Sequence, residues 1–159
     1  MPVCDVALLT DHRYTADSAA PGDWYLGNIL ADDRLLQAAL ARRGLTTRRV
    51  DWAAADIDWS SFRCAVFRTT WDYFDRYSEF SAWLARVEGQ TRLCNPASTI
   101  RWNVDKHYLA DLAARGVPVV PSRFLERGDS SLAEVLSETG WDEAVIKPLC
   151  GQRGPAHTA

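Results

Sequence analysis

Two lysines are the residues with the clearest chemical implication in this chain of 159 residues. There are 18 lysines and arginines, and only Lys106 and Lys147 are lysines, which leaves 16 arginines. An ammonium group serves phosphate as a flexible point charge, whereas a guanidinium favours planar, bidentate partners. The two lysines are therefore candidate phosphate-binding residues. The alternative is two ordinary surface lysines in a chain whose arginines reflect codon bias.

Both lysines stand where predicted elements begin or end. Lys147 closes an apolar run predicted as a strand over 143–148, and a segment containing Gly151 and Gly154 follows it. Lys106 stands at the start of a predicted helix that Asn103 or Asp105 would cap. The helix dipole disfavours a cation at that end, and an anion bound there would offset this cost.

A second group of polar residues follows the predicted strands of the N-terminal half. The segment Arg68-Thr69-Thr70-Trp71-Asp72-Tyr73 comes directly after a buried strand over 64–67, and Thr10-Asp11 follows a buried strand over 3–9. Asn95 ends a short strand over 92–95. Ligands of parallel sheets bind beyond the carboxyl ends of the strands, so these residues predict the functional edge.

The elements that position these residues alternate between strand and helix. A fourth strand is predicted over 46–50, and helices are predicted from Asp32 or Asp33 to Gly44 and from 78 to 87. The apolar faces of these helices are Leu35, Leu36, Ala39 and Leu40 for the first, and Phe80, Trp83, Leu84 and Val87 for the second. Such alternation predicts a parallel sheet with helices on both faces.

The pattern changes after Pro96, and a domain boundary is predicted near residues 95–100. A helix ending at Gly116 is followed by a proline-bearing extended run over 117–125. Ser131 and Glu134 fit a capping box that opens a last helix, which ends at Gly140.

Net charge, the lengths of apolar segments and the spacing of cysteines and histidines argue against several classes of protein. The net charge of -3 and the sequence pI of about 5.6 argue against a nucleic-acid partner. There is no long apolar segment and no signal-peptide pattern, so we expect a cytoplasmic protein without a membrane partner. The four cysteines form no C-x-x-C pair and the three histidines are scattered, so no metal site and no catalytic thiol are predicted.

Several segments, in this order, resemble the ATP-grasp proteins. They are Arg68 to Tyr73, Asn95-Pro96, Trp102-Asn103-Val104-Asp105-Lys106, Gly116 to Pro121, and Val145-Ile146-Lys147-Pro148. Within that superfamily the chain is similar to bacterial ligases related to prokaryotic glutathione synthetase and to the cyclo-ligases that close O-ureido-serine. The resemblance runs from about residue 3 to residue 148.

The resemblance implies an α/β fold in three parts. Residues 1–95 would form a Rossmann-like pre-ATP-grasp domain with a parallel sheet, on the substrate side. Residues 96–148 would form the first part of an ATP-grasp domain, an incomplete α+β subdomain, and residues 149–159 an atypical tail. Family members make an acylphosphate from a carboxylate and ATP with Mg²⁺, and an amine then displaces phosphate. Their ATP lysines match Lys106 and Lys147, and Arg68, Thr69, Trp71 and Asp72 would face the small-molecule substrate.

The chain departs from the family after Pro148. The family's phosphate-covering loop, adenine-binding strands and acidic metal ligands are not recognisable in residues 149–159. We therefore expect a fragment, a frameshifted product or a split protein that binds ATP weakly or not at all and is inactive by itself, with no catalytic residue of its own. The alternative function is a non-catalytic binding domain of the flavodoxin or receiver type, in which the lysines are surface residues.

Overall fold

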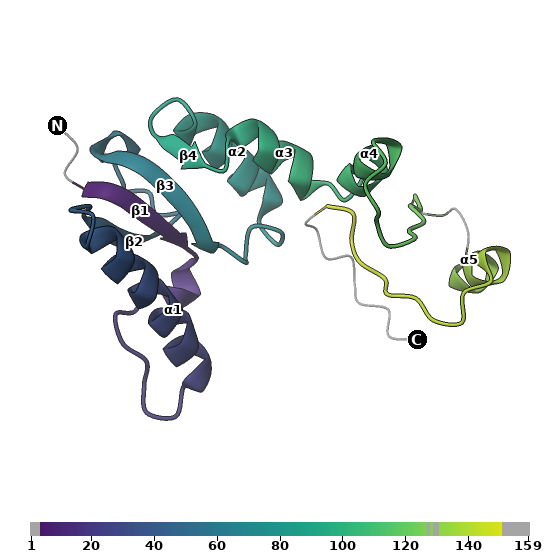
Figure 1. The fold of residues 1–159 in the computed structure, drawn as a ribbon, viewed down its shortest axis with the longest axis horizontal. Helices are drawn as coiled ribbons and strands as arrows, with labels where there is room; N and C mark the ends of the chain where they lie inside the picture. Colours follow the sequence, from purple (N-terminus) through teal and green to yellow (C-terminus); the bar gives the residue numbers. More distant parts are fainter. Residues whose placement is uncertain (1–3, 127, 129–130, 151–159) are drawn as a thin grey trace. The chain divides into compact units, whose positions relative to one another are not determined.

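The chain divides into two compact units. A computed structural model describes residues 4–126, 128 and 131–150 (Figure 1). Unit 1 is Met1–Ile100 and unit 2 is Arg101–Ala159.

Unit 1 is built on a parallel sheet of four strands in the order β2-β1-β3-β4. The strands are β1 (Cys4–Thr10), β2 (Thr47–Asp51), β3 (Phe62–Thr69) and β4 (Arg92–Cys94). In the centre, Leu8 of β1 pairs with Arg49 of β2 and with Val66 of β3. The four predicted strands of this half are confirmed, and β3 extends two residues further than predicted, so Arg68 and Thr69 belong to the strand.

Two helices connect the strands and cover opposite faces of the sheet. Helix α1 (Trp24–Ala41) leads from β1 outwards to β2, and α2 (Tyr77–Val87) leads from β3 outwards to β4. Because such crossovers are right-handed, connections that run in opposite directions place their helices on opposite sides, as Figure 1 shows. The α/β class with helices on both faces is confirmed. The connection from β1 and the connection from β3 run towards opposite edges of the sheet, so the direction of winding reverses between these two strands.

An aromatic core fills the α2 face. Trp52, Trp59 and Trp83 are each at most 2% exposed. The Trp83 ring centroid lies 5.8 Å from that of Trp52, 5.5 Å from that of Trp59 and 5.9 Å from that of Phe67. The prediction for α2 is confirmed in extent and in its buried face, because Phe80, Trp83, Leu84 and Val87 are all buried.

The prediction for α1 is wrong at its start and at Leu35, whereas Leu36, Ala39 and Leu40 of the predicted face are half-buried. The helix begins at Trp24, where the side chain of Asp23 accepts a hydrogen bond of 3.0 Å from the Leu26 amide. Asp33 is therefore mid-helix and only 1% exposed, whereas Leu35 is 72% exposed. The buried face runs through Ile29, Leu30 and Asp33, so a carboxylate occupies a position that the apolar pattern cannot reveal.

The remaining helices follow β4. They are α3 (Ala97–Val104), α4 (Tyr108–Ala114) and α5 (Leu132–Thr139). The sequence did not predict α3. The capping box of α5 is confirmed, with both reciprocal bonds between Ser131 and Glu134 and a left-handed Gly140 at φ 70°.

The prediction of a strand over 143–148 is wrong. These residues form no strand in the described part of the chain, and neither do residues 117–125. Val145 is 82% exposed and Ile146 is 70% exposed. An extended apolar segment becomes a strand only through a hydrogen-bonded neighbour, and the described part of unit 2 offers none. Residue 3 of the first predicted strand and residues 151–159 of the predicted tail lie outside the described residues.

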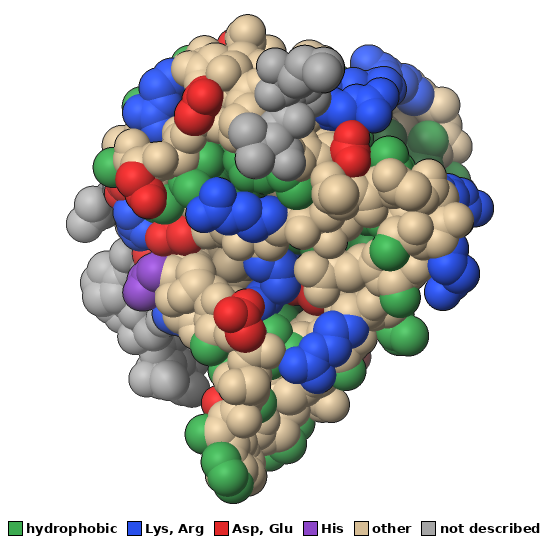
Figure 2. All heavy atoms as spheres, turned by 90° about the vertical axis from the view of Figure 1, so that its left-hand side faces the viewer, with side chains coloured by type: hydrophobic (Ala, Val, Ile, Leu, Met, Phe, Trp, Pro, Cys, Tyr) green, Lys and Arg blue, Asp and Glu red, His purple; other side chains and the backbone are tan. Residues whose placement is uncertain are grey.

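The surface carries mixed charge. Figure 2 shows Lys and Arg side chains in several separate groups on one face, with Asp and Glu side chains between them. Of the helices formed by the described residues, none has the length and apolar character needed to cross a bilayer.

Candidate functional site

The winding direction reverses between β1 and β3, which places a crevice at the carboxyl ends of these two strands. Contacts between the two strand ends close this crevice. The hydroxyl oxygens of Thr10 and Thr69, both buried, lie 2.6 Å apart. The Asp11 amide donates to the Thr69 carbonyl at 3.0 Å. A ligand at this edge must therefore bind to one side of the crevice.

A pocket of about 350 Å³ lies on the α1 side of this edge, and we call it the edge pocket. It is lined by Trp24, Tyr25, Asn28, Ile29, Asp32, Asp33, Arg68, Thr69 and Trp71. Three of the four predicted substrate residues, Arg68, Thr69 and Trp71, are thus brought together with the first turns of α1.

Aromatic side chains form the wall of the edge pocket. Trp24 is 73% exposed and Trp71 is 41% exposed. Tyr14, from the short 3₁₀ helix His12–Tyr14, packs edge-on against Trp71 with centroids 5.6 Å apart, and lies 6.1 Å from Tyr25. Exposed aromatic rings at the mouth of a pocket offer flat apolar surface and quadrupoles that attract cationic or planar ligand groups.

The floor of the edge pocket is an ionic network. Nε of Arg68 donates to Oδ1 of Asp33 at 2.9 Å, and Nη2 of Arg68 is paired with Asp32. The hydrogen bond to Asp33 is the main cause that raises the pKa of Arg68, so this guanidinium stays charged. Among the described residues Nη1 of Arg68 has no acceptor, which leaves donors for a ligand oxygen.

Asp72, the fourth predicted substrate residue, serves the α2 face instead. It is 4% exposed, and Oδ1 accepts from the indole nitrogen of Trp52 at 2.7 Å. Oδ2 accepts from Nη1 of Arg76 at 2.9 Å and lies 3.6 Å from Nδ1 of His12. Asp72 is absent from the lining of the edge pocket. Its contacts anchor the segment that carries Trp71.

Asp11 is a second buried carboxylate with a structural partner. Its side chain accepts from the backbone amide, Nε and Nη2 of Arg13 at 3.0, 2.9 and 2.6 Å. Burial acts to raise the pKa of Asp11, but the bonds from Arg13 outweigh it and the pKa is lowered. The ion pair fixes the turn after β1.

The two lysines lie in unit 2. Lys106 does not open a helix as predicted, because it lies in the turn before α4, which begins at Tyr108. Its backbone amide donates to the Leu149 carbonyl at 3.0 Å, and its Nζ is 3.5 Å from the same oxygen. Lys147, two residues before Leu149, is exposed.

The fit to a magnesium nucleotide is partial. Lys106 and Lys147 are cations that phosphate oxygens could contact. No group of three or more His, Cys, Asp or Glu side chains able to hold a metal ion is found in the part of the chain that the structure describes. The described residues thus offer cations for phosphate oxygens but no acidic group for a magnesium ion.

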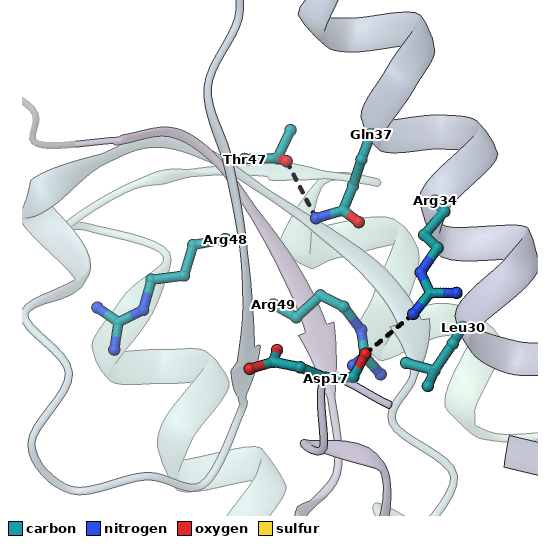
Figure 3. Close-up of a pocket in the computed structure, with 7 residues that line it drawn as sticks. All are labelled: Asp17, Leu30, Arg34, Gln37, Thr47, Arg48 and Arg49. Atoms are coloured by element: carbon teal, nitrogen blue, oxygen red, sulfur yellow. Dashed lines mark hydrogen bonds between the residues drawn. The ribbon is translucent and has the colours of Figure 1, made fainter. Parts of the chain in front are cut away.

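A second pocket, of about 310 Å³, lies between α1 and β2 (Figure 3). Its polar groups are largely bonded to one another, since Gln37 donates to Thr47 at 3.2 Å and Arg34 donates to the Asp17 carbonyl at 3.0 Å. Figure 3 shows the Arg48 side chain directed away from these residues. The edge pocket is the better candidate site.

Comparison with known proteins identifies the family of unit 1. A family model described as the N-terminal domain of the D-cycloserine synthetase DcsG matches residues 6–95. The chain belongs to this family. The matched range contains every residue that lines the edge pocket.

A curated protein and a crystal structure are similar to most of the chain. The cycloserine biosynthesis protein DcsG of Streptomyces lavendulae is 42% identical over 112 residues, which are 68% of this chain and 38% of that protein. The crystal structure of D-cycloserine synthetase DcsG matches with a TM-score of 0.62 and 36% identity, covering 85% of this chain and 42% of that one. The chain spans about two fifths of the length of both relatives.

The edge pocket includes residues that sequence reasoning missed. The predicted start of α1 was eight residues too late. This error hid Trp24, Tyr25, Asn28 and the pairing of Asp32 with Arg68. The signal was present in Gly22-Asp23: Gly22 takes a left-handed φ of 87°, and Asp23 is a good N-cap residue directly before Trp24.

Proposed function

We propose that this chain is the substrate-side N-terminal portion of an ATP-grasp carboxylate–amine ligase, and that its edge pocket binds the small-molecule substrate. The observation that carries the proposal is the DcsG domain match over residues 6–95, which contains the whole pocket. Both relatives are named for cycloserine synthesis or biosynthesis. Family membership favours this function over the flavodoxin-type or receiver-type binding domain.

The chemistry of the pocket supports a small ligand with an anionic or carbonyl oxygen. Nη1 of Arg68 has no acceptor among the described residues, and the hydrogen bond to Asp33 favours the charged form of this guanidinium. Trp24, Tyr25 and Trp71 supply flat surface around it. These residues bind and orient, and none of them is assigned a proton transfer.

Unit 2 contributes the proposed nucleotide contacts. Lys106 and Lys147 would hold phosphate oxygens of ATP, which supplies the activating phosphoryl group in ligases of this kind. The described residues do not provide the acidic ligands for magnesium, so we expect weak nucleotide binding and no ligation from them alone.

A ligand titration tests the proposal. The chain would be titrated with D-cycloserine and with O-ureido-serine while the indole N–H signals of Trp24 and Trp71 are followed by NMR. Saturable shifts are expected, and Arg68→Lys should weaken binding about tenfold or more, because a guanidinium that reaches two partners is replaced by a point charge.

Arg34→Lys is the matched control. Arg34 lies on α1, the helix that carries Trp24 and Asp32, but it lines only the second pocket, so its replacement should leave the titration unchanged. Equal binding by wild type and Arg68→Lys would contradict the assignment of the edge pocket, and so would the absence of any shift at Trp24 and Trp71.

A further inference from the structure

We infer that Asp33 is the positioning residue of the edge pocket: a single buried carboxylate that holds Arg68 at the floor and, through Arg49, the segment whose Tyr14 packs behind the wall residues Tyr25 and Trp71. The role in ligand binding rests on the proposed function. The role in shaping the pocket rests only on the geometry of unit 1.

The first part of the inference is the way in which Asp33 joins three elements. It lies on α1, where its side chain is 2% exposed. Oδ1 accepts from Nε of Arg68 on β3 at 2.9 Å, and Oδ2 accepts from Nε of Arg49 on β2 at 2.8 Å. Each carboxylate oxygen of Asp33 thus fixes one arginine, and in both arginines the donor atom is Nε.

The second part runs from Arg49 to the wall. Arg49 has a side chain that is 8% exposed, and its Nη1 donates to the Ala16 carbonyl at 2.9 Å while its Nη2 donates to the Tyr14 carbonyl. Tyr14 in turn packs against Trp71 and Tyr25. The guanidinium therefore ties the loop after β1 to the sheet through two backbone carbonyls, and Asp33 fixes the orientation of that guanidinium.

Charge explains why the network depends on Asp33. Two guanidinium groups meet on the α1 face of the sheet, and Arg49 is buried with Asp33 as its only carboxylate partner among the described residues. A buried charge is strongly destabilising when it loses its partner. Without the Asp33 charge, Arg49 and Arg68 would repel each other and turn towards solvent, and both the floor and the wall would lose their fixed positions.

Asp33 acts through these arginines, since both of its oxygens are already bonded. Asp32, its neighbour, is different: its side chain is 69% exposed, and its ion pair within the described residues is with Arg68. Replacing Asp32 should alter the floor alone. Replacing Asp33 should alter the floor and the wall together.

The test compares Asp33→Asn and Arg49→Lys with Arg34→Lys. Asp33→Asn keeps the shape of the side chain and removes its charge. Arg49→Lys keeps a cation for Asp33, but the lysine side chain cannot also reach the carbonyls of Tyr14 and Ala16. Arg34→Lys is the control, because Arg34 contacts the same loop at the Asp17 carbonyl without contacting Asp33.

Indole N–H signals provide a readout that separates positioning from stability. Trp71 reports on the wall, whereas the buried Trp52 and Trp83 report on the opposite face of the sheet. Asp33→Asn and Arg49→Lys are expected to shift or broaden the Trp71 signal and leave those of Trp52 and Trp83 in place. Their Kd for D-cycloserine should rise about tenfold or more. Arg34→Lys should change neither quantity.

An unchanged Trp71 signal in Asp33→Asn, with the core signals in place, would overturn the inference. If Asp33→Asn loses the core signals as well, Arg49→Lys decides in the same way. The proposed function fails separately: if wild type does not bind D-cycloserine but Trp71 responds to Asp33→Asn, the positioning role stands and the ligand assignment falls.

Discussion

The strongest stability prediction compares two buried tryptophans of the same aromatic core. Trp52 and Trp83 are 0% and 2% exposed, and both pack against Phe80. The indole N–H of Trp52 donates to Asp72, whereas that of Trp83 has no hydrogen-bond partner among the described residues. Replacing either residue with Phe removes the same atoms, so the loss of buried volume is similar and cancels in the comparison.

The two substitutions differ in the polar groups that they leave without a partner in the core. Trp52→Phe leaves Oδ1 of the buried Asp72 without its indole donor, and a hydrogen bond to a charged group contributes about 1.5–3 kcal/mol. It also weakens the contact of the Arg76 guanidinium, 4.9 Å from the Trp52 ring centroid, by a fraction of the roughly 0.5–1 kcal/mol of such contacts. We expect Trp52→Phe to lower the free energy of unfolding by about 2 kcal/mol more than Trp83→Phe does.

Urea unfolding followed by circular dichroism measures this difference, provided that both variants keep the m value of the wild type. Because both substitutions lie in unit 1, any contribution of unit 2 is common to them. Equal destabilisation, or a larger effect of Trp83→Phe, would refute the account of Asp72 as a carboxylate anchored by Trp52 and Arg76.

Three further predictions follow from individual contacts. Because the pKa of Asp11 is lowered in the folded protein, its contribution to stability is present above its ordinary pKa of 3.8 and is lost as the pH falls through the lower folded value. The difference in urea midpoint between wild type and Asp11→Asn should therefore shrink in acid, and a constant difference would contradict the Arg13 pair. In unit 2, Lys147→Ala should weaken ATP binding measured by calorimetry, and binding that the substitution leaves unchanged would exclude Lys147 as a phosphate contact. Ser131→Ala should speed amide exchange at the start of α5, since it removes the N-cap acceptor, and unchanged exchange would show that the cap is dispensable.

The sheet of unit 1 could be predicted because its signals are local. Short apolar runs ending at polar residues mark each strand, and the spacing of Phe80, Trp83 and Val87 marks α2 before Gly89 ends the pattern. These features are confirmed because the buried face of each element is apolar, so the sequence pattern and the packing coincide.

The start of α1 could not be predicted from apolar spacing because a carboxylate, Asp33, interrupts its buried face. Asp33 occupies a core position only because Arg49 and Arg68 neutralise it from two strands that are distant in the sequence. No local pattern distinguishes such a carboxylate from one at a helix cap. The part of the pocket wall that α1 contributes was missed for the same reason, whereas Arg68, Thr69 and Trp71, which had been predicted as substrate residues, line the same pocket.

Asp72 shows a different limit. Its position beside Trp71 at the carboxyl edge of the sheet suggested a ligand contact, but the turn after β3 directs these two neighbouring side chains to opposite sides of the sheet. Trp71 faces the α1 side and Asp72 the core of the α2 side, as the pocket lining and the bond from Trp52 show. In unit 2, the exposed Val145 and Ile146 show that an apolar run does not establish a strand unless a neighbouring strand pairs with it.

The length of α1 restricts how this family could alter the depth of its pocket. The helix has 18 residues, about 27 Å at 1.5 Å per residue, whereas β2 has five residues, roughly 17 Å. Its first turn, with Trp24 and Tyr25, stands ahead of the segment that Ile29 and Leu30 pack onto the sheet. A residue inserted between them lifts the wall by about 1.5 Å but also rotates it by about 100°. Two insertions would turn the aromatic rings away from Arg68, while four would bring them back to within about 40° and raise the wall by about 6 Å. The depth of the pocket can therefore change only in steps of about one helical turn.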